Sequence, residues 1–342
     1  MKTIKVAING AGRIGRAFIK VARQHPELEV VAVNDLADIK SIAYLLKYDT
    51  AYGVSEFPIE VRGTSLVVDG KEIKYISEKD PAKLPWGTLG IDVVVESTGL
   101  FTTYEKAQAH IAAGAKKVVI SAPVKDEPLA GLAGGTILMG INEDKLASCV
   151  ISSNASCTTN AGSPLMAILH EAIGIEKALL NTVHGYTASQ GIVDSPNKKD
   201  LREGRAAAQN IVPSSTGAAI AVTKVLPDLK GKFDGISIRV PVVVGSIVDI
   251  TFIAKRKTTA EEVNDILRKA AKSDRWKKVF DATEEPLVSS DIIGNSHASI
   301  ADLALTRVVD GNLVKVMAWY DNEMGYTYTL VDHVIKTAES IK

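Results

Sequence analysis

Short apolar runs rich in valine and isoleucine recur through the first half of the chain and alternate with amphipathic segments. Four of these runs have the length and composition of buried parallel strands: Ile4–Ile8, Val30–Val33, Ile91–Val95 and Lys117–Ile120. A helical pattern lies between the last two, from about Thr103 to Ala113. This alternation predicts a Rossmann-type α/β domain with a doubly wound sheet. Three shorter alternating runs indicate a small β insertion: Phe57–Val61, Ser65–Val68 and Ile73–Ile76.

The second half carries longer strand-like runs, which favour an α+β domain with a mostly antiparallel sheet: Ala178–Val183, Gly235–Val240, Ile247–Ala254 and Leu313–Tyr320. A helix is predicted at Thr259–Lys272, opened by a capping box between Thr259 and Glu262. The segment Thr329–Ile341 is also predicted to be helical. We expect one domain over residues 1–156 and another over 157–322, with a C-terminal helix, about residues 323–342, returning to the first.

A glycine-rich turn follows the first predicted strand directly and opens a helical run. Gly10, Gly12 and Gly15 form the pattern GxGxxG, which permits a tight turn, a close backbone approach to a pyrophosphate and close helix–strand packing. The phosphates would lie at the helix N-terminus. Asp35 ends the second predicted strand, where its carboxylate can accept hydrogen bonds from an adenosine ribose and repel a 2′-phosphate. The pattern therefore predicts NAD rather than NADP as cofactor, the alternative being an ordinary glycine turn.

Composition narrows the class of protein. The 342 residues suffice for two domains, and 40 basic residues balance 40 acidic ones, with no long basic run. We therefore expect neither nucleic acid nor an anionic membrane as a partner. No apolar stretch approaches the roughly 18 residues of a membrane span, and the first apolar run is too short for a signal peptide, which favours a cytoplasmic location. With two cysteines and no metal-ligand spacing, no disulfide framework and no metal site are expected.

Cys157 is the candidate nucleophile. It lies on a polar turn between a predicted strand, Cys149–Ser152, and a predicted helix in which Pro164 should fall early. A helix N-terminus lowers the pKa of a thiol, and its free N–H groups can hold an oxyanion. Cys149, inside an apolar run, is interpreted as a core residue. The spacing alone leaves a second interpretation open, in which Cys157, like Cys149, is a small apolar residue of the core.

His184 is the candidate base, because it ends the predicted strand Ala178–Val183. The other histidines are expected on solvated helix or loop surfaces: His25, His110, His170, His297 and His333. Position alone leaves the role of His184 open.

Several motifs, in this order, resemble those of phosphorylating glyceraldehyde-3-phosphate dehydrogenases of the bacterial type over nearly the whole chain. They are INGAGRIGR at Ile8–Arg16, VNDL at Val33–Leu36, LLKYD at Leu45–Asp49, VVESTG at Val94–Gly99, SNASCTTN at Ser153–Asn160, TVHGYT at Thr182–Thr187, STGAA at Ser215–Ala219, RVP at Arg239–Pro241 and WYDNEMGY at Trp319–Tyr326. The resemblance implies a cytoplasmic homotetramer that oxidises glyceraldehyde 3-phosphate with NAD and phosphate to 1,3-bisphosphoglycerate in glycolysis.

The resemblance also implies roles for individual residues. Cys157 would be the nucleophile that forms a thioester, and His184 its base. The cofactor positions are Gly10, Gly12, Arg13, Ile14, Gly15, Asp35, Thr98, Ser121 and, for the nicotinamide carboxamide, Asn322. The C3 phosphate of the substrate would meet Thr187 and Arg239. The attacking phosphate would meet Ser156, Thr158, Thr216 and Gly217.

One departure from the family pattern bears on the attacking phosphate. Glu203 stands where the family usually has an arginine, and an anion beside phosphate should weaken its binding. Our hypothesis is that nearby cations compensate: Arg202, Arg205, Lys198 or Lys199. Weaker phosphate affinity and a different acyl acceptor stay open. Ser189 also replaces the aspartate usual beside the C3-phosphate site.

Two alternatives follow. Erythrose-4-phosphate dehydrogenase, or another non-phosphorylating aldehyde dehydrogenase of this fold, would use the same cysteine and histidine but water as the acyl acceptor. A non-catalytic NAD-binding scaffold would need neither residue.

Overall fold

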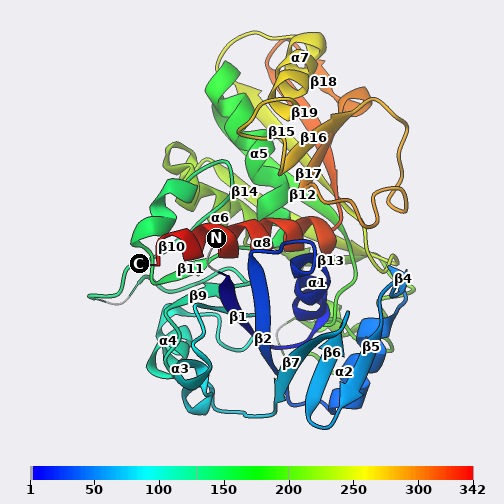
Figure 1. The fold of residues 1–342 in the computed structure, drawn as a ribbon. Coiled ribbons are helices and arrows are strands. Elements are labelled where there is room, and N and C mark those ends of the chain that lie inside the picture. Colours follow the sequence, from blue (N-terminus) through cyan, green and yellow to red (C-terminus); the bar gives the residue numbers. More distant parts are fainter. Residues whose placement is uncertain (1–2, 129, 199, 342) are drawn as a thin grey trace. The chain divides into compact units, whose positions relative to one another are not determined.

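The computed structural model describes residues 3–128, 130–198 and 200–341, which divide into two compact units (Figure 1). The first unit comprises the chain up to Ala155 together with the segment from Thr327 onward, and the second is Ser156–Tyr326. Lys199, one of the cations considered near Glu203, lies outside the described residues.

The first unit is built on a nine-stranded sheet with the order β10-β11-β9-β8-β1-β2-β7-β6-β5. Its central strands are parallel and apolar: β1 (Ile4–Asn9), β2 (Leu28–Asn34), β8 (Val93–Glu96) and β9 (Lys117–Ile120). The strand order reverses at β1, because β2 lies on one side of it and β8 on the other. The predicted doubly wound fold is confirmed, and the carboxyl ends of β1 and β8 form its topological switch point.

The predicted β insertion widens this sheet. The strands β5 (Ile59–Arg62), β6 (Ser65–Val68) and β7 (Lys71–Ile76) form an antiparallel meander, and β7 pairs parallel with β2. The opposite edge is made by β11 (Ile151–Ser153) and β10 (Gly134–Thr136). The strands β3 (Tyr48–Asp49) and β4 (Gly53–Val54) form a separate ribbon.

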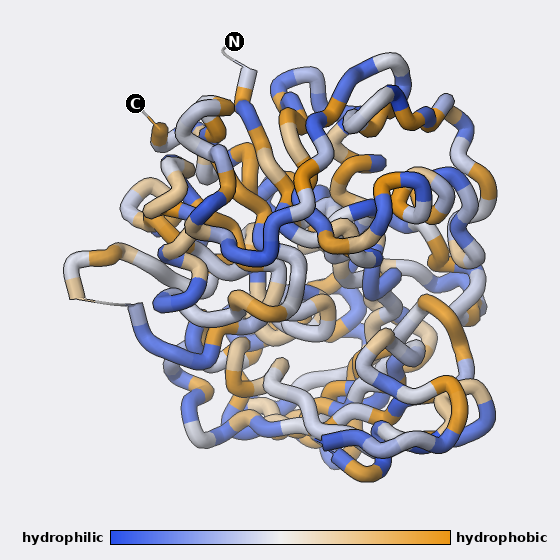
Figure 2. Tube along the Cα trace, turned by 90° about the horizontal axis from the view of Figure 1, so that it is seen from below, coloured by the Kyte–Doolittle hydropathy of each residue, from blue (hydrophilic) through white to orange (hydrophobic). Residues whose placement is uncertain are grey.

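Five helices accompany this sheet among the described residues: α1 (Arg13–Ala22), α2 (Ile39–Lys47), α3 (Trp86–Leu89), α4 (Tyr104–Ala112) and α8 (Met324–Glu339). Thr103 caps α4 by accepting a hydrogen bond from the Lys106 N–H, as its position before the helix favours. The helix α8 begins five residues before the predicted start at Thr329. Its His333 contacts Ser152 of β11, and its Lys336 pairs with Glu143. Along the chain trace, apolar and polar segments alternate (Figure 2).

The second unit is built on an eight-stranded sheet with the order β13-β14-β12-β15-β19-β17-β16, to which β18 adds beside β19. The strands are β12 (Ile175–Gly185), β13 (Val212–Ser215), β14 (Phe233–Val240), β15 (Ser246–Ala254), β16 (Phe280–Thr283), β17 (Ser299–Asp302), β18 (Arg307–Val309) and β19 (Leu313–Tyr320). Most pairs are antiparallel, as predicted, but β12 pairs parallel with β14, and β16 with β17.

The helices of this unit are α5 (Cys157–Ile173), α6 (Ala218–Val225) and α7 (Ala260–Ala271). The helix α5 packs against β12, β15 and β19 and is mostly buried. The expectation that Pro164 falls early in it is wrong, since seven helical residues precede Pro164. The capping box of α7 is only half formed: Thr259 accepts from the Glu262 N–H, while the Glu262 carboxylate pairs with Arg256.

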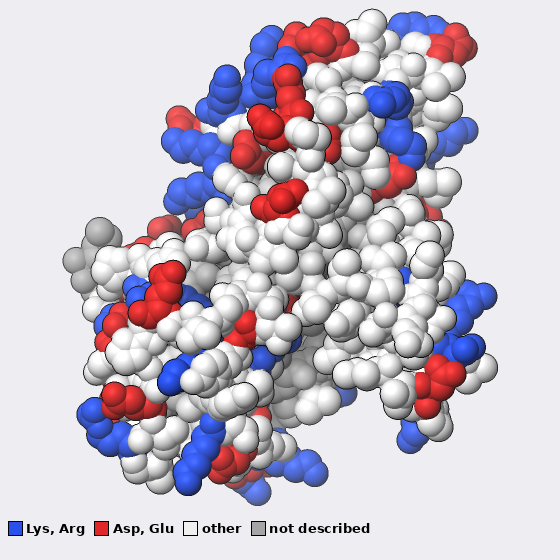
Figure 3. Space-filling view, turned by 90° about the vertical axis from the view of Figure 1, so that its right-hand side faces the viewer, with Lys and Arg blue, Asp and Glu red and all other residues white. Residues whose placement is uncertain are grey.

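On the face drawn in Figure 3, acidic and basic side chains are interspersed rather than gathered by sign. Among the described residues, no helix is long and apolar enough to cross a membrane.

Candidate functional site

The glycine turn between β1 and α1 has the geometry that its sequence predicts. Gly10 has a φ of +99°, and a Cβ there would lie 2.7 Å from the Thr98 nitrogen; one at Gly15 would lie 2.0 Å from the Gly10 oxygen. At Gly12 an added Cβ would meet no protein atom within 4 Å. The packing of the chain therefore does not require glycine at position 12, whereas a ligand that approaches this backbone closely would.

The residues around this turn fit a dinucleotide. The first turn of α1 has no acidic residue, and no side chain caps it, so its N–H groups can receive an anion. Arg13 begins the helix and pairs with Asp49 at 2.8 Å, and Ile14 follows it, half-buried. Asp35 directly follows β2 and accepts a hydrogen bond from the Ala11 N–H of the turn at 2.6 Å. Asp35 thus lies beside the turn, where a ribose next to the pyrophosphate would reach it.

Thr98 and Ser121 lie at the carboxyl ends of neighbouring strands. Thr98 follows β8, and its hydroxyl is bonded to Glu96. Ser121 follows β9, and its N–H donates to the Glu96 carbonyl. In a doubly wound sheet ligands bind beyond these ends, so both side chains belong to the cofactor edge of the first unit. Asn322 belongs to the second unit, where its Oδ1 accepts hydrogen bonds from the Gly245 N–H and the Ser246 hydroxyl.

Cys157 is the first residue of α5. Ser156 is the N-cap, and its hydroxyl accepts a hydrogen bond from the Thr159 N–H. Ala155, just before the cap, is buried and has a φ of +54°. A non-glycine residue in this left-handed region is strained by roughly 1 kcal/mol or more, a cost met mainly at functional turns. The turn directs the sulfur of Cys157 to 3.4 Å from the Nε2 atom of His184.

The position of His184 follows from the parallel pairing of β12 and β14, in which His184 is the partner of Arg239. The Nδ1 atom of His184 lies 2.6 Å from the Gly185 oxygen and 2.5 Å from an Arg239 guanidinium nitrogen. A carbonyl only accepts and a guanidinium only donates, so one tautomer satisfies only one of these contacts. With the proton on Nδ1, directed at Gly185, the lone pair of Nε2 faces the sulfur, as a base requires.

Burial shifts both members of this pair. It raises the pKa of the Cys157 thiol, although the Arg239 charge and the N–H groups of Thr158 and Cys157 act in the opposite direction. It also lowers the pKa of His184, to about 3, with the charge of Arg239 as the second cause. Both groups are therefore neutral at neutral pH in the free chain. The expectation of a thiol with a low pKa is wrong here, because lost hydration outweighs the helix N-terminus.

Hydroxyl groups surround the pair. The Thr158 hydroxyl lies 3.0 Å from the hydroxyl of Tyr320, which is also 2.7 Å from that of Thr182. The ring of Tyr320 meets that of His184 edge-on, with centroids 5.8 Å apart. Burial raises the pKa of Tyr320, so this phenol stays protonated. Tyr320 therefore fixes both Thr158 and the imidazole.

The remaining predicted phosphate residues lie on the same unit. The Thr187 hydroxyl is 3.1 Å from that of Ser189, one of the two residues that depart from the family pattern. Thr216 accepts a hydrogen bond from the Ala218 N–H, and the exposed Gly217 is the N-cap of α6. The Glu203 carboxylate accepts a hydrogen bond from the Ser214 hydroxyl at 2.6 Å.

Comparison with known proteins agrees with this geometry. The sequence profile "Glyceraldehyde 3-phosphate dehydrogenase, NAD binding domain" matches residues 4–104, and "Glyceraldehyde 3-phosphate dehydrogenase, C-terminal domain" matches residues 156–322. The chain is 50% identical over 336 residues to a glyceraldehyde-3-phosphate dehydrogenase of Borreliella burgdorferi, with 96% of this chain and 98% of the relative covered. The chain belongs to the glyceraldehyde-3-phosphate dehydrogenase family.

Other relatives agree. Identity is 50% over 332 residues to the glyceraldehyde-3-phosphate dehydrogenase of Geobacillus stearothermophilus, covering 96% of each chain. It is 48% over 331 residues to glyceraldehyde-3-phosphate dehydrogenase B of Aspergillus oryzae, covering 96% of this chain and 97% of the relative. The resemblance seen in the motifs is confirmed, and the first unit carries the NAD binding domain of the glyceraldehyde-3-phosphate dehydrogenase family.

The sequence interpretation of two histidines is wrong. His110 and His333 are fully buried rather than solvated. His333 contacts Ser152 and Asn154, and burial lowers its pKa to about 3. Three residues of the quoted glyceraldehyde-3-phosphate dehydrogenase motifs also received no role from the sequence: Asn9, Glu96 and Tyr320. Their place inside those motifs was the available signal.

Proposed function

We propose that the chain, an NAD-dependent dehydrogenase, oxidises D-glyceraldehyde 3-phosphate and passes the acyl group to inorganic phosphate through a thioester on Cys157. The observation that carries the proposal is the 3.4 Å approach of the Cys157 sulfur to the His184 Nε2 atom at the start of α5. The product is 1,3-bisphosphoglycerate, as in glycolysis.

Attack begins from a neutral pair. As the sulfur of Cys157 attacks the aldehyde carbon, His184 takes the thiol proton and returns it to the new alkoxide, giving a hemithioacetal. The N–H groups of Cys157 and Thr158 face the sulfur and are placed to donate to that oxygen while it is charged. His184 then accepts the hemithioacetal hydroxyl proton as hydride leaves C1, which yields the thioester.

NAD, when bound, supplies the acceptor for the hydride. The residues that would hold it are Gly10, Gly12, Arg13, Ile14, Gly15, Asp35, Thr98, Ser121 and Asn322. The Asp35 carboxylate beside the turn opposes a 2′-phosphate and favours NAD.

Arg239 and Thr187 would hold the C3 phosphate of the substrate. In the free chain Arg239 contacts the Nδ1 atom of His184. An anion that draws the guanidinium away leaves Nδ1 free to donate to Gly185, which is the tautomer the base needs. Substrate binding and base activation are coupled in this way.

Ser156, Thr158, Thr216 and Gly217 would receive the attacking phosphate. The attacking phosphate displaces the thiolate of Cys157 from the acyl carbon, and His184 returns its proton to that thiolate. Glu203 accepts a hydrogen bond from the Ser214 hydroxyl, which leaves its charge unchanged, and Arg205 is paired with the exposed Asp194. If loop cations such as Arg202 or Lys198 offset Glu203, then Glu203→Arg should change the KM for phosphate by less than about threefold. A tenfold fall in that KM, or acyl transfer to water as in erythrose-4-phosphate dehydrogenase, would contradict this compensation.

We further propose a cytoplasmic homotetramer, in which residues 1–156 with the C-terminal helix, about 323–342, form the NAD-binding domain and residues 157–322 the catalytic domain. Support for the assembly comes from large apolar side chains exposed on the second sheet, among them Leu179 and Ile236.

The test is NADH production from glyceraldehyde 3-phosphate with and without phosphate. We expect phosphate dependence, loss of activity in Cys157→Ser and after iodoacetamide treatment, and full activity in Cys149→Ser as the matched control. Activity retained in Cys157→Ser would overturn the thioester mechanism.

A further inference from the structure

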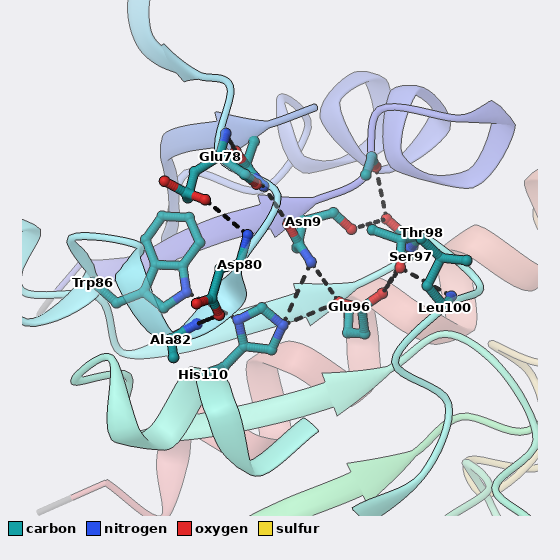
Figure 4. Close-up of polar contacts among 12 residues, drawn as sticks. Asn9, Glu78, Asp80, Ala82, Trp86, Glu96, Ser97, Thr98, Leu100 and His110 are labelled. Atoms are coloured by element: carbon teal, nitrogen blue, oxygen red, sulfur yellow. Dashed lines mark hydrogen bonds and ion pairs between the residues drawn. The ribbon is translucent and has the colours of Figure 1, made fainter. Parts of the chain in front are cut away.

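A buried polar network lies at the switch point of the first sheet, and the mechanism above does not use it (Figure 4). Its centre is Glu96, the last residue of β8, whose side chain is 1% exposed. Around it lie Asn9 of β1 and His110 of α4, also buried, and Trp86 of α3. Among the described residues, no lysine or arginine contacts the Glu96 carboxylate.

Trp86 fixes the tautomer of His110. The indole N–H can only donate, and it lies 3.1 Å from the Nδ1 atom of His110, so that atom must accept. The remaining proton of the neutral ring is then on Nε2, which lies 3.0 Å from a Glu96 oxygen and donates to it. The Asn9 amide nitrogen lies 3.5 Å from the same Nε2 atom. Both atoms are donors, so this contact is not a hydrogen bond.

Glu96 therefore accepts hydrogen bonds at both oxygens. One oxygen receives His110 and the Asn9 amide, at 3.0 and 2.6 Å. The other receives the backbone N–H and the hydroxyl of Thr98, at 2.8 and 2.5 Å. Because a carboxylate oxygen already receiving these donors can only accept, the single hydroxyl proton of Thr98 is directed at Glu96.

This arrangement fixes what Thr98 can offer to a ligand. Its oxygen already accepts from the Leu100 N–H at 3.0 Å, and its proton is engaged, so the remaining capacity is one lone pair. We propose that Glu96 is a positioning residue for the dinucleotide, holding Thr98 as a hydrogen-bond acceptor toward a donor on the cofactor, such as a ribose hydroxyl or an amide NH₂. The inference rests on the proposed function.

The strand order indicates which half of the dinucleotide would lie next to Thr98. Asp35 follows β2, the glycine turn follows β1, and Thr98 follows β8, in the spatial order β2-β1-β8. With the adenosine ribose at Asp35 and the pyrophosphate at the turn, Thr98 lies on the side of the nicotinamide half. Asn9 links Glu96 to the neighbouring strand β2, because its Oδ1 accepts a hydrogen bond from Asn34. The Asn34 side chain is in turn bonded to the backbone of Glu78.

The experiment measures the Kd of NAD and of AMP by calorimetry for the full chain, its Glu96→Gln and Thr98→Val variants and the double variant. Each single substitution should raise the Kd of NAD by roughly tenfold, the size of one lost hydrogen bond, and leave that of AMP unchanged. The double variant should be no weaker than either single variant, since Glu96 acts through Thr98. Glu78→Gln is the matched control and should leave both Kd values unchanged, because in the described part of the chain the Glu78 carboxylate accepts a hydrogen bond only from the Asp80 N–H.

Several results would overturn the proposal: an unchanged Kd of NAD, effects that multiply in the double variant, or an equal loss of AMP binding. If Glu96→Gln does not fold, Thr98→Val against Thr98→Ser still decides, because only serine keeps the hydroxyl. Failure of the unsubstituted chain to bind NAD would instead contradict the proposed function.

Discussion

The charge of Arg239 acts on both members of the Cys157–His184 pair. It opposes the rise that burial causes in the pKa of Cys157, so Arg239→Gln should move that pKa higher still. The thiolate is the reactive form, and its ordinary pKa is 9.0. In the free chain, we expect the rate of Cys157 alkylation by iodoacetamide to increase with pH and to reach half of its maximum above pH 9. In Arg239→Gln this midpoint should lie at a still higher pH. The measurement is made in a Cys149→Ser background, and a shift to lower pH would contradict it.

His184 should stay neutral through the physiological range, since burial holds its pKa near 3. A neutral imidazole is the form that takes a proton from Cys157. Replacing it by asparagine removes the base, which should lower kcat by about 10²- to 10⁴-fold. Steady-state kinetics check the rate, and an NMR titration of the ring should give a protonation midpoint below pH 5. A midpoint near the ordinary value for histidine would mean that the imidazole is solvated rather than buried.

The turn between β1 and α1 allows a prediction that separates folding from cofactor binding. At Gly15 a Cβ would lie 2.0 Å from the Gly10 oxygen, so Gly15→Ala should cost roughly 1–3 kcal/mol of stability and also weaken NAD binding. At Gly12 a Cβ meets no protein atom, so Gly12→Ala should leave the thermal midpoint within about 1–2 °C and still weaken NAD binding. Differential scanning fluorimetry and calorimetry give the two quantities. A Gly12→Ala chain that binds NAD normally would show that no ligand approaches this backbone.

Elements with a clear hydrophobic period could be predicted from the sequence. The predicted strands Lys117–Ile120 and Leu313–Tyr320 have the bounds of β9 and β19 in the structure. The start of α8 could not be predicted, because consecutive residues there, Tyr326 and Thr327, are both buried and form no amphipathic pattern. The same limit explains Pro164, which the buried helix α5 tolerates in its interior.

Only those parts of the candidate site that have a local sequence signature could be predicted. The glycine turn, Asp35 and the polar turn at Cys157 have local signatures. The approach of Cys157 to His184 depends on how α5 packs on β12, and the burial of His110 depends on Trp86 and Glu96. Contacts between residues far apart in the sequence decide these facts, so local periodicity could not provide them.

At the scale of the whole molecule, one face of the second sheet carries exposed apolar side chains among polar ones such as Asn181 and Asp234. The alternation of side chains puts Leu179 of β12 and Ile236 of β14 on the same face, where they are 66% and 55% exposed. Ile220 of α6, which is 60% exposed, and Leu179 line one surface pocket together. Apolar side chains gathered in this way mark interaction surfaces, and a homotetramer would bury them against further copies of the chain.

Leu179→Glu tests this assembly. In an interface between identical copies a residue at the contact recurs on both sides, so each new carboxylate would be buried without a partner, at a cost of several kcal/mol. We expect multi-angle light scattering to give the mass of a tetramer for the unsubstituted chain and a smaller mass for Leu179→Glu. Val288→Glu is the matched control: Val288 is 57% exposed but lies outside the strands of this sheet, so the same change there should leave the mass unaltered. A tetramer that survives Leu179→Glu would mean that the chain assembles through another surface, and a monomeric unsubstituted chain would rule the assembly out.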